Sequence, residues 1–155
     1  MDGHEQWLSE CEKLGYKPEA RLYAEGTRPS QDAADQLGCD VAHIAKSIVF
    51  AGEGGRAVVV ITSGANRVER KRKLKRLLGY KPSMTDAEYI KESTGYFPGG
   101  VPPFGHLKPC TVLMDEDLLQ YDLVWGAGGT AQTVFPITPE DLLSLSGATV
   151  GDVRQ

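Results

Sequence analysis

The sequence lacks the features that define several common classes of protein. Its three cysteines are widely spaced and form no CxxC pair, which argues against a disulfide framework or a zinc site and fits a reducing compartment. No apolar run reaches the roughly 18 residues that a membrane-spanning helix needs. The first residues, Met1-Asp2-Gly3-His4-Glu5, are acidic, whereas a secretory signal begins with basic residues. We therefore expect a cytoplasmic protein with no membrane partner.

Motifs for cofactors and metals are missing as well. Neither a P-loop pattern nor the GxGxxG pattern of dinucleotide-binding folds occurs. The histidines, His4, His43 and His106, have no metal-ligand spacing with one another or with the cysteines. We expect no cofactor and no metal. The net charge of −4 provides no general attraction to nucleic acid, so DNA is not an expected partner and RNA would need a local basic patch.

The length and the predicted elements favour a single α+β domain over residues 1–155. A chain of 155 residues can bury a substantial core, and its predicted helices and strands do not alternate regularly. Periodicity and capping residues predict helices at 4–14, 30–38, 67–78, 86–93 and 138–147, and strands at 21–24, 41–50, 57–62, 110–114, 123–126 and 133–137. The pairs Asn66 with Glu69 and Thr85 with Glu88 are predicted capping boxes. Residues after Gly147 are expected to form a frayed tail.

A segment rich in glycine and proline, residues 95–105, is the most unusual stretch of the chain. It has four glycines, three prolines and three aromatic residues in eleven positions, and no charge. Glycine permits positive φ and close approach of the backbone, and proline fixes φ. We expect a rigid pocket wall in which Gly99 and Gly100 let a ligand reach the main chain. The alternative is a tight connection capped by aromatic packing; a second glycine cluster at 126–130 and Lys46, at the head of an apolar strand, favour the pocket.

The segment 67–76 carries the strongest charge in the chain, with seven basic residues in ten. Charge of this density on an otherwise acidic protein can bind RNA phosphates through counterion release. The alternative is a solvated helix face. If the segment binds RNA, one of the aromatic residues Tyr96, Phe97 and Phe104 is expected to stack on the terminal base. The alternative is that these residues belong to the core. The expected RNA contacts are Arg67, Arg70, Lys71, Arg72 and Lys75.

Several spaced motifs resemble the YbaK/prolyl-tRNA-synthetase-associated family. They are Thr27-Arg28, His43-Ile44-Ala45-Lys46-Ser47-Ile48-Val49-Phe50, Gly99-Gly100-Val101-Pro102-Pro103-Phe104-Gly105, Met114-Asp115-Glu116, Gly128-Gly129-Thr130 and Pro139-Glu140-Asp141-Leu142-Leu143. The resemblance covers about residues 20–147. The combination of motifs is specific, although each motif alone is weak.

Members of this family are aminoacyl-tRNA deacylases, either free-standing or inserted in prolyl-tRNA synthetase. The resemblance implies a mixed, barrel-like β-sheet with helices packed around it. It also implies hydrolysis of the ester that joins a wrong amino acid to the tRNA 3′ end. With no synthetase domain in the sequence, the chain resembles the free-standing kind, which edits in trans. The expected partners are a mischarged tRNA, such as tRNA(Pro), and an aminoacyl-tRNA synthetase.

The resemblance implies that Lys46 is catalytic, because a lysine here is the residue most tied to activity in the family. Its setting between Ile44, Ala45 and Ile48 predicts partial desolvation, which strengthens its electrostatic action and lowers its pKa. An aminoacyl ester is already activated, so a positioned water, a stabilised oxyanion and a selective cavity suffice. The alternative is a lysine that snorkels from a strand end. The residues expected to bind substrate, several through bare backbone amides, are Thr27, Ser47, Gly99, Gly100, Pro102, Phe104, Gly128, Gly129 and Thr130.

The sequence does not identify the general base of the reaction. Some family members have a histidine near the second glycine turn, but residues 129–133 contain none. In some relatives the thiol or ammonium of the substrate itself assists, which would need no protein base. His106, at the exit of the first loop, is the best alternative, ahead of His43 and Cys39. The missing histidine leaves a second function open, a non-catalytic module of the same fold that binds a small molecule or the tRNA end.

Overall fold

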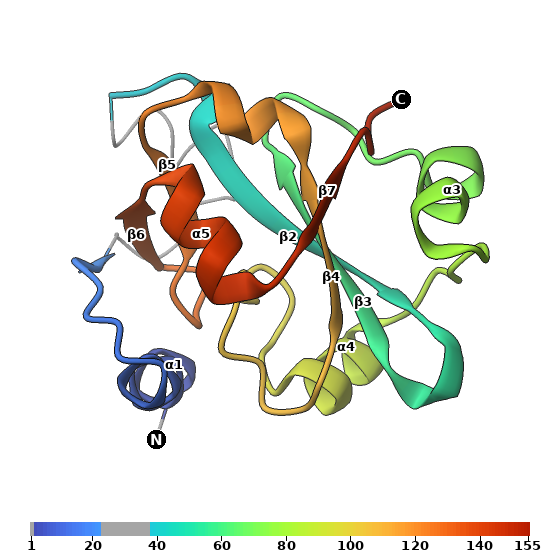
Figure 1. Ribbon diagram of the computed structural model, residues 1–155. Helices are drawn as coiled ribbons and strands as arrows, with labels where there is room; N and C mark the ends of the chain where they lie inside the picture. Colours follow the sequence, from blue (N-terminus) through green and yellow to red (C-terminus); the bar gives the residue numbers. More distant parts are fainter. Residues whose placement is uncertain (1, 23–37) are drawn as a thin grey trace.

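A mixed β-sheet of seven strands lies at the centre of the computed structural model, which describes residues 2–22 and 38–155 (Figure 1). The strands are β1 (Arg21–Leu22), β2 (Ile44–Ala51), β3 (Ala57–Ser63), β4 (Thr111–Asp115), β5 (Val124–Ala127), β6 (Thr133–Ile137) and β7 (Thr149–Gly151). The α-helices of the described part are α1 (Gly3–Lys13), α3 (Lys75–Leu78), α4 (Ala87–Thr94) and α5 (Pro139–Ser146). The strand order is β1-β6-β5-β2-β3-β4-β7. The predicted α+β class with a mixed sheet is confirmed, and the sheet is open, with β1 and β7 as its two edges.

The hairpin of β2 and β3 forms the middle of the sheet. Its antiparallel register runs from Ala45 opposite Ser63 to Ala51 opposite Ala57. All seven residues of β3 are buried, because β2 and the parallel strand β4 flank it and side chains cover both faces. The strand predicted at 57–62 is therefore confirmed as β3, the second strand of a hairpin, and it is buried on both faces.

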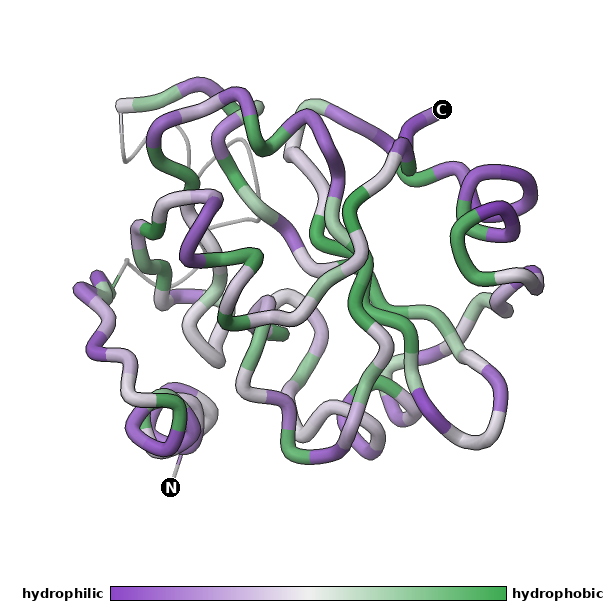
Figure 2. Tube along the Cα trace, in the orientation of Figure 1, coloured by the Kyte–Doolittle hydropathy of each residue, from purple (hydrophilic) through white to green (hydrophobic). Residues whose placement is uncertain are grey.

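Side chains alternate along β2, so its two faces contact different parts of the protein. On one face, which we call the loop face, Ala45 belongs to the larger hydrophobic cluster together with Tyr96 and Phe104. On the other, which we call the basic face, Phe50 packs in a second cluster with Leu74 of the basic segment. Figure 2 shows the hydrophobic stretches of the trace converging on the middle of the sheet.

Helices α1, α4 and α5 match their predicted bounds to within a residue. In α1 the carboxylate of Asp2 accepts a hydrogen bond from the N–H of Glu5, and α5 has Thr138 as its N-cap and Gly147 in the left-handed region as its end. The cap of α4 is Asp86, one residue beyond the predicted Thr85. The strands predicted at 110–114, 123–126 and 133–137 match β4, β5 and β6 to within a residue.

The predicted frayed tail is wrong. Residues 149–151 form β7, which pairs in parallel with β4, and Val153 beyond it is fully buried. The isolated bridge between Val68 and Arg154 then joins the tail to the basic segment.

Two predictions lie outside the described residues, the helix at 30–38 and the substrate-binding residue Thr27. The strand predicted at 21–24 is described only at residues 21–22, which form β1. None of the described helices has the length and apolar character to span a bilayer.

Candidate active site

Lys46 lies on the basic face of β2, opposite Thr62 of β3. Its side chain is half-buried and lines a groove together with Arg67. Burial, and next the nearby charge of Arg67, lower the pKa of Lys46. The partial desolvation expected from its apolar neighbours is therefore present, and a second cation, Arg67, lines the same groove.

The groove beside Lys46 has a volume of about 560 Å³. It is formed by the second half of β2, by the start of the basic segment, by residues 84–85 and by the last residue of the chain. Its lining residues are Lys46, Ile48, Val49, Phe50, Arg67, Val68, Glu69, Arg70, Lys71, Met84, Thr85 and Gln155.

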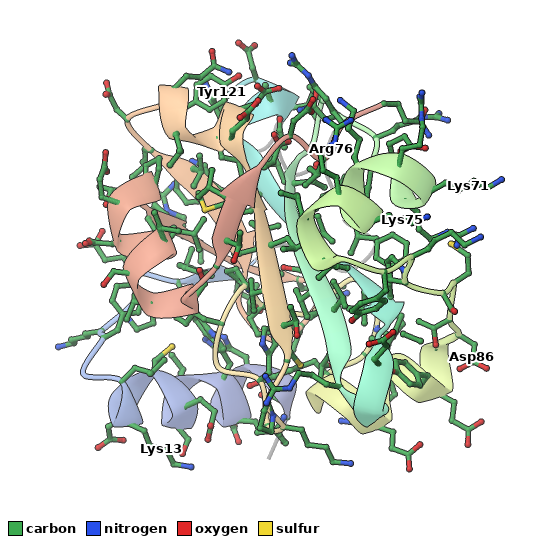
Figure 3. All side chains as sticks on the ribbon, turned by 45° about the vertical axis from the view of Figure 1, so that its right-hand side comes forward. Lys13, Lys71, Lys75, Arg76, Asp86 and Tyr121 are labelled. Atoms are coloured by element: carbon green, nitrogen blue, oxygen red, sulfur yellow. The ribbon has the colours of Figure 1, made fainter. Side chains whose placement is uncertain are left out.

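The basic segment begins its helix later than predicted. Residues 67–69 are extended and pair with the C-terminal tail, and the helical part starts with a π-turn at Arg70–Leu74 that continues into α3. Glu69 is the cap, since its carboxylate accepts hydrogen bonds from the N–H groups of Arg72 and Lys73. Figure 3 shows Lys71 projecting away from the body of the protein, with Lys75 and Arg76 on α3.

The predicted cap Asn66 has another role. Its Nδ2 donates to the carboxylates of Asp115 and Asp117, each at 2.8 Å. Asp115 is completely buried and also accepts from the Oγ1 of Thr62 and the N–H of Ser63. This network fixes the corner that leads from β3 into the basic segment. The sequence indicated it only through the motif Met114-Asp115-Glu116, which gives no role for the carboxylate.

The two glycine turns meet on the loop face. A Cβ on Gly100 would lie 2.7 Å from the Cα of Thr130, and one on Gly129 would collide with the carbonyl oxygen of Gly3 in α1. The N–H of Gly100 donates to the carbonyl of Phe97, and that of Gly128 to the carbonyl of Thr133. These glycines therefore permit close packing of backbone on backbone, and two of the predicted binding amides are already engaged within their own turns.

Helix α1 joins both turns through side chains that donate to backbone carbonyls. His4 donates to the carbonyl of Gly128 at 2.7 Å, and Gln6 to that of Gly95 at 2.9 Å. Trp7, fully buried, donates from its indole nitrogen to the carbonyl of Phe104 at 3.0 Å. The first turn of α1 is thus part of this site, a contribution that the local sequence of α1 does not reveal.

A second pocket, of about 420 Å³, lies where α1 and the two turns meet. Gly100, Gly129 and Thr130 line it, together with Phe97, which is 68% exposed, and Lys91, whose amine lies 4.6 Å from the centre of the Phe97 ring. An exposed ring with a cation over it can stack on a base.

The other two aromatic candidates for a stacked base belong to the core. Tyr96 and Phe104 are buried at 1% and 2% exposure. The hydroxyl of Tyr96 donates to the carbonyl of Gly105. Of the three aromatic residues considered, Phe97 alone presents an accessible face.

Lys46 and the glycine turns line separate pockets in the described part of the chain. Ser47, next to Lys46, points to the loop face by alternation, and its Oγ is buried without a hydrogen-bond partner. A buried hydroxyl with no partner is unusual and is typical of a place where a ligand or water binds. Of the predicted substrate residues, Ser47 has this signature.

The remaining site candidates have structural contacts. His106 donates from Nε2 to the carbonyl of Pro102 at 2.7 Å, and burial lowers its pKa. His43 packs edge-on against Tyr121. Burial raises the pKa of Cys39, which makes it a poor nucleophile. None of these contacts resembles a general base with an orienting partner.

Comparisons with known proteins agree with one another. The family described as "Aminoacyl-tRNA editing domain" matches residues 24–145. The chain is 31% identical over 120 residues to "Uncharacterized protein YwhH" of Bacillus subtilis, covering 77% of this chain and 76% of that protein. It is 25% identical over 146 residues to "Putative Cys-tRNA(Pro)/Cys-tRNA(Cys) deacylase EbsC" of Enterococcus faecalis, covering 94% and 89%. A crystal structure of "a putative trans-editing enzyme for prolyl tRNA synthetase" superposes with a TM-score of 0.93 at 38% identity, covering 100% and 98%.

Proposed function

The chain belongs to the aminoacyl-tRNA editing domain family, and we propose that it edits in trans, with a mischarged tRNA(Pro) as its substrate. Its activity class is that of an aminoacyl-tRNA deacylase, as the family and the relatives indicate. The choice of tRNA(Pro) is supported by the name of the Enterococcus faecalis relative and by the description of the crystal structure. Prolyl-tRNA synthetase, which would produce the wrongly charged tRNA, is the proposed partner.

The reaction is the hydrolysis of an ester. A water oxygen forms a bond to the carbonyl carbon of the amino acid, the bond to the ribose oxygen breaks, and the products are a free amino acid and a tRNA with its terminal hydroxyl restored. Negative charge develops on the carbonyl oxygen in the transition state, so a nearby cation accelerates the step. In the proposed mechanism the ammonium of Lys46 supplies that charge.

One observation of the structure carries this role. Lys46 is a half-buried cation on a central strand, with no ion pair to any carboxylate in the described residues, and it lines an open groove. A lysine that merely snorkels would place its amine in bulk water, where burial would not lower its pKa. Ser47, on the loop face, is proposed to bind another part of the substrate through its unpartnered hydroxyl.

Further contacts with the RNA and with the amino acid are proposed for the residues expected from the sequence. The basic segment would hold the RNA through Arg67, Arg70, Lys71, Arg72 and Lys75. The other residues proposed to contact the substrate do so away from the groove of Lys46, where the glycine turns form a separate pocket. They are Thr27, Gly99, Gly100, Pro102, Phe104, Gly128, Gly129 and Thr130.

The test is a deacylation panel with Cys-tRNA(Pro), Ala-tRNA(Pro) and Ser-tRNA(Pro). We expect faster loss of at least one ester than in buffer, and a fall of about 100-fold or more in kcat/KM for Lys46→Ala, comparable to removal of one transition-state donor. Lys17→Ala, an exposed lysine outside the groove, is the matched control and should retain the activity. Full activity in Lys46→Ala would refute the role of Lys46.

A second function is favoured by one observation, the engagement of the Gly100 and Gly128 amides within their own turns. A site with fewer free donors suits a module that binds the tRNA end without cleaving it. This alternative is correct if none of the esters in the panel is hydrolysed faster than in buffer and the protein still binds uncharged tRNA(Pro).

A further inference from the structure

The groove beside Lys46 has positive charge that its own acid does not neutralise. Four basic side chains line it against one acidic one: Lys46, Arg67, Arg70 and Lys71 against Glu69. The carboxylate of Glu69 is engaged by the N–H groups of Arg72 and Lys73, at 2.8 and 2.9 Å. The described residues provide no ion pair for Lys46 or Arg67. A half-buried cation beside a second cation is unfavourable until an anion binds between them.

The backbone of residues 67–69 and the guanidinium of Arg70 are held in place before any ligand binds. The carbonyl of Arg67 accepts from the N–H of Gln155 at 2.9 Å, and the N–H of Glu69 donates to the carbonyl of Val153 at 2.7 Å. Arg70 donates from Nη1 to the carbonyl of Pro82 at 3.0 Å. Groups fixed in this way lose little conformational entropy when a ligand binds, which favours affinity.

The size and lining of the groove indicate an extended ligand. Its volume of about 560 Å³ is typical of sites for molecules of many atoms and far exceeds the needs of a single inorganic phosphate. Apolar surface from Ile48, Phe50, Val68 and Met84 accompanies the charges, and Met84 is 69% exposed. The backbone of an RNA strand is extended and carries charged phosphates beside less polar sugars. It therefore matches both the size of the groove and its mixture of charged and apolar side chains.

We propose that this groove binds the backbone phosphates of the RNA substrate next to the scissile ester, with the nearest phosphate between Lys46 and Arg67. The inference rests on the proposed function, which supplies an RNA whose 3′ end must reach Lys46. Arg67 is then a binding residue that the enzyme needs for tRNA and does not need for a substrate without phosphate. The proposal divides the basic segment, since Arg67, Arg70 and Lys71 line the groove and Arg72 and Lys75 do not.

The first experiment compares Arg67→Gln with Arg76→Gln. Both changes remove one positive charge from an exposed arginine of the same segment, but Arg67 lines the groove, whereas Arg76 lies on α3 (Figure 3) and does not. We expect Arg67→Gln to raise KM for Cys-tRNA(Pro) about tenfold, as for loss of one charge-assisted hydrogen bond, and Arg76→Gln to change it less than about twofold. With 3′-cysteinyl-adenosine, which has no phosphate, both variants should match the wild type. Equal effects of the two variants on tRNA, or loss of adenosine ester hydrolysis in Arg67→Gln alone, would overturn the proposal.

The second experiment measures binding without chemistry. Uncharged tRNA(Pro), with or without its terminal CCA, is titrated by fluorescence anisotropy against wild type and Arg67→Gln. If Arg67 contacts the 3′ end, removal of CCA weakens binding to the wild type and has little effect on Arg67→Gln. Additive losses would refute the assignment. If the wild type hydrolyses neither ester, the proposed function fails, and this cycle still decides whether the groove binds the RNA end.

Discussion

At the scale of single residues, the neighbours Lys46 and Ser47 show how one strand serves two pockets. Lys46 points to the basic face and Ser47 to the loop face, because successive side chains of a strand alternate. Each carries a feature that folding alone does not explain, a half-buried charge in one and a buried hydroxyl without a partner in the other. Features of this kind reduce stability and are retained where function requires them.

Lys46→Met should therefore make the folded protein more stable while it abolishes deacylation. Burial and Arg67 lower the pKa of Lys46 below 10.5, so the unfolded chain holds this proton more readily than the folded one. The charged ammonium of Lys46 therefore destabilises the folded state. This destabilisation is complete at a pH below the pKa that Lys46 has in the folded protein, and it disappears as the pH rises toward and above the pKa that Lys46 has in the unfolded chain. We expect a gain of about 0.5–1 kcal/mol at pH 7, and a smaller gain near pH 10.5.

Urea unfolding at the two pH values measures this effect. Lys46→Arg keeps the positive charge at both and is the control, for which we expect no gain. An equal gain for Lys46→Met at both pH values would point to better apolar packing as its cause.

At the scale of elements, the sequence predicted what local signals determine. Gly15 ends α1, and Thr138 and Gly147 bound α5, because a cap and a stop glycine act within one turn. The cap of α1, Asp2, was not predicted. The start of the basic helix and the frayed tail were wrong for one shared reason. Residues 67–69 pair with the C-terminal tail and β7 pairs with β4, and periodicity within a segment does not reveal a partner far along the chain.

The candidate site shows the same limit. The pattern around Lys46 correctly indicated a partly desolvated lysine, but its neighbour Arg67 comes from another element. The glycine clusters indicated freedom of the backbone without saying what approaches it. What approaches Gly129 is the first turn of α1, and no property of residues 126–130 identifies that helix.

Gly129→Ala should displace α1. Gly129 has a φ of +98°, and an added Cβ would also collide with the carbonyl of Gly3 and lie 3.0 Å from the Cβ of Trp7. Gly99→Ala is the matched control, since Gly99 has a φ of +88° but its Cβ would meet only Ala131, at 3.7 Å. Backbone strain alone costs about 1–2 kcal/mol, and we expect Gly129→Ala to cost at least twice as much as Gly99→Ala.

Tryptophan fluorescence and urea unfolding check this prediction. Trp7 is fully buried, so its emission should shift to longer wavelength in Gly129→Ala and stay unchanged in Gly99→Ala. Similar losses of stability in both variants would mean that the contact with α1 contributes little.

At the scale of the whole molecule, the charge is unevenly distributed. The chain has a net charge of −4, yet seven basic residues lie within 67–76. RNA is therefore attracted to one side of the protein and repelled by much of the rest, which restricts the orientations in which it binds. The C-terminal tail lies on the attractive side, where Arg154 pairs with Asp117 and Lys73 pairs with Asp152.

Deletion of residues 152–155 should separate RNA binding from ester hydrolysis. The deletion removes the buried side chain of Val153 and the two backbone hydrogen bonds that hold residues 67–69, at a cost of about 3 kcal/mol in unfolding free energy. With its anchor lost, Arg67 is no longer fixed beside Lys46, so KM for Cys-tRNA(Pro) should rise. Hydrolysis of 3′-cysteinyl-adenosine should stay within about twofold of the full-length rate, as expected for a change that affects mainly a phosphate contact.

Hydrogen exchange gives an independent measure of the same change. The amide of Glu69, which donates to Val153, should lose protection in the truncated protein, while amides of β3 keep theirs because its pairing with β2 and β4 is intact. Arg154→Gln is the control, since it removes the ion pair with Asp117 and leaves the tail backbone in place. If the truncated protein binds tRNA as tightly as the full chain does, the basic segment orders itself without the tail, and the preorganisation of the groove has another source.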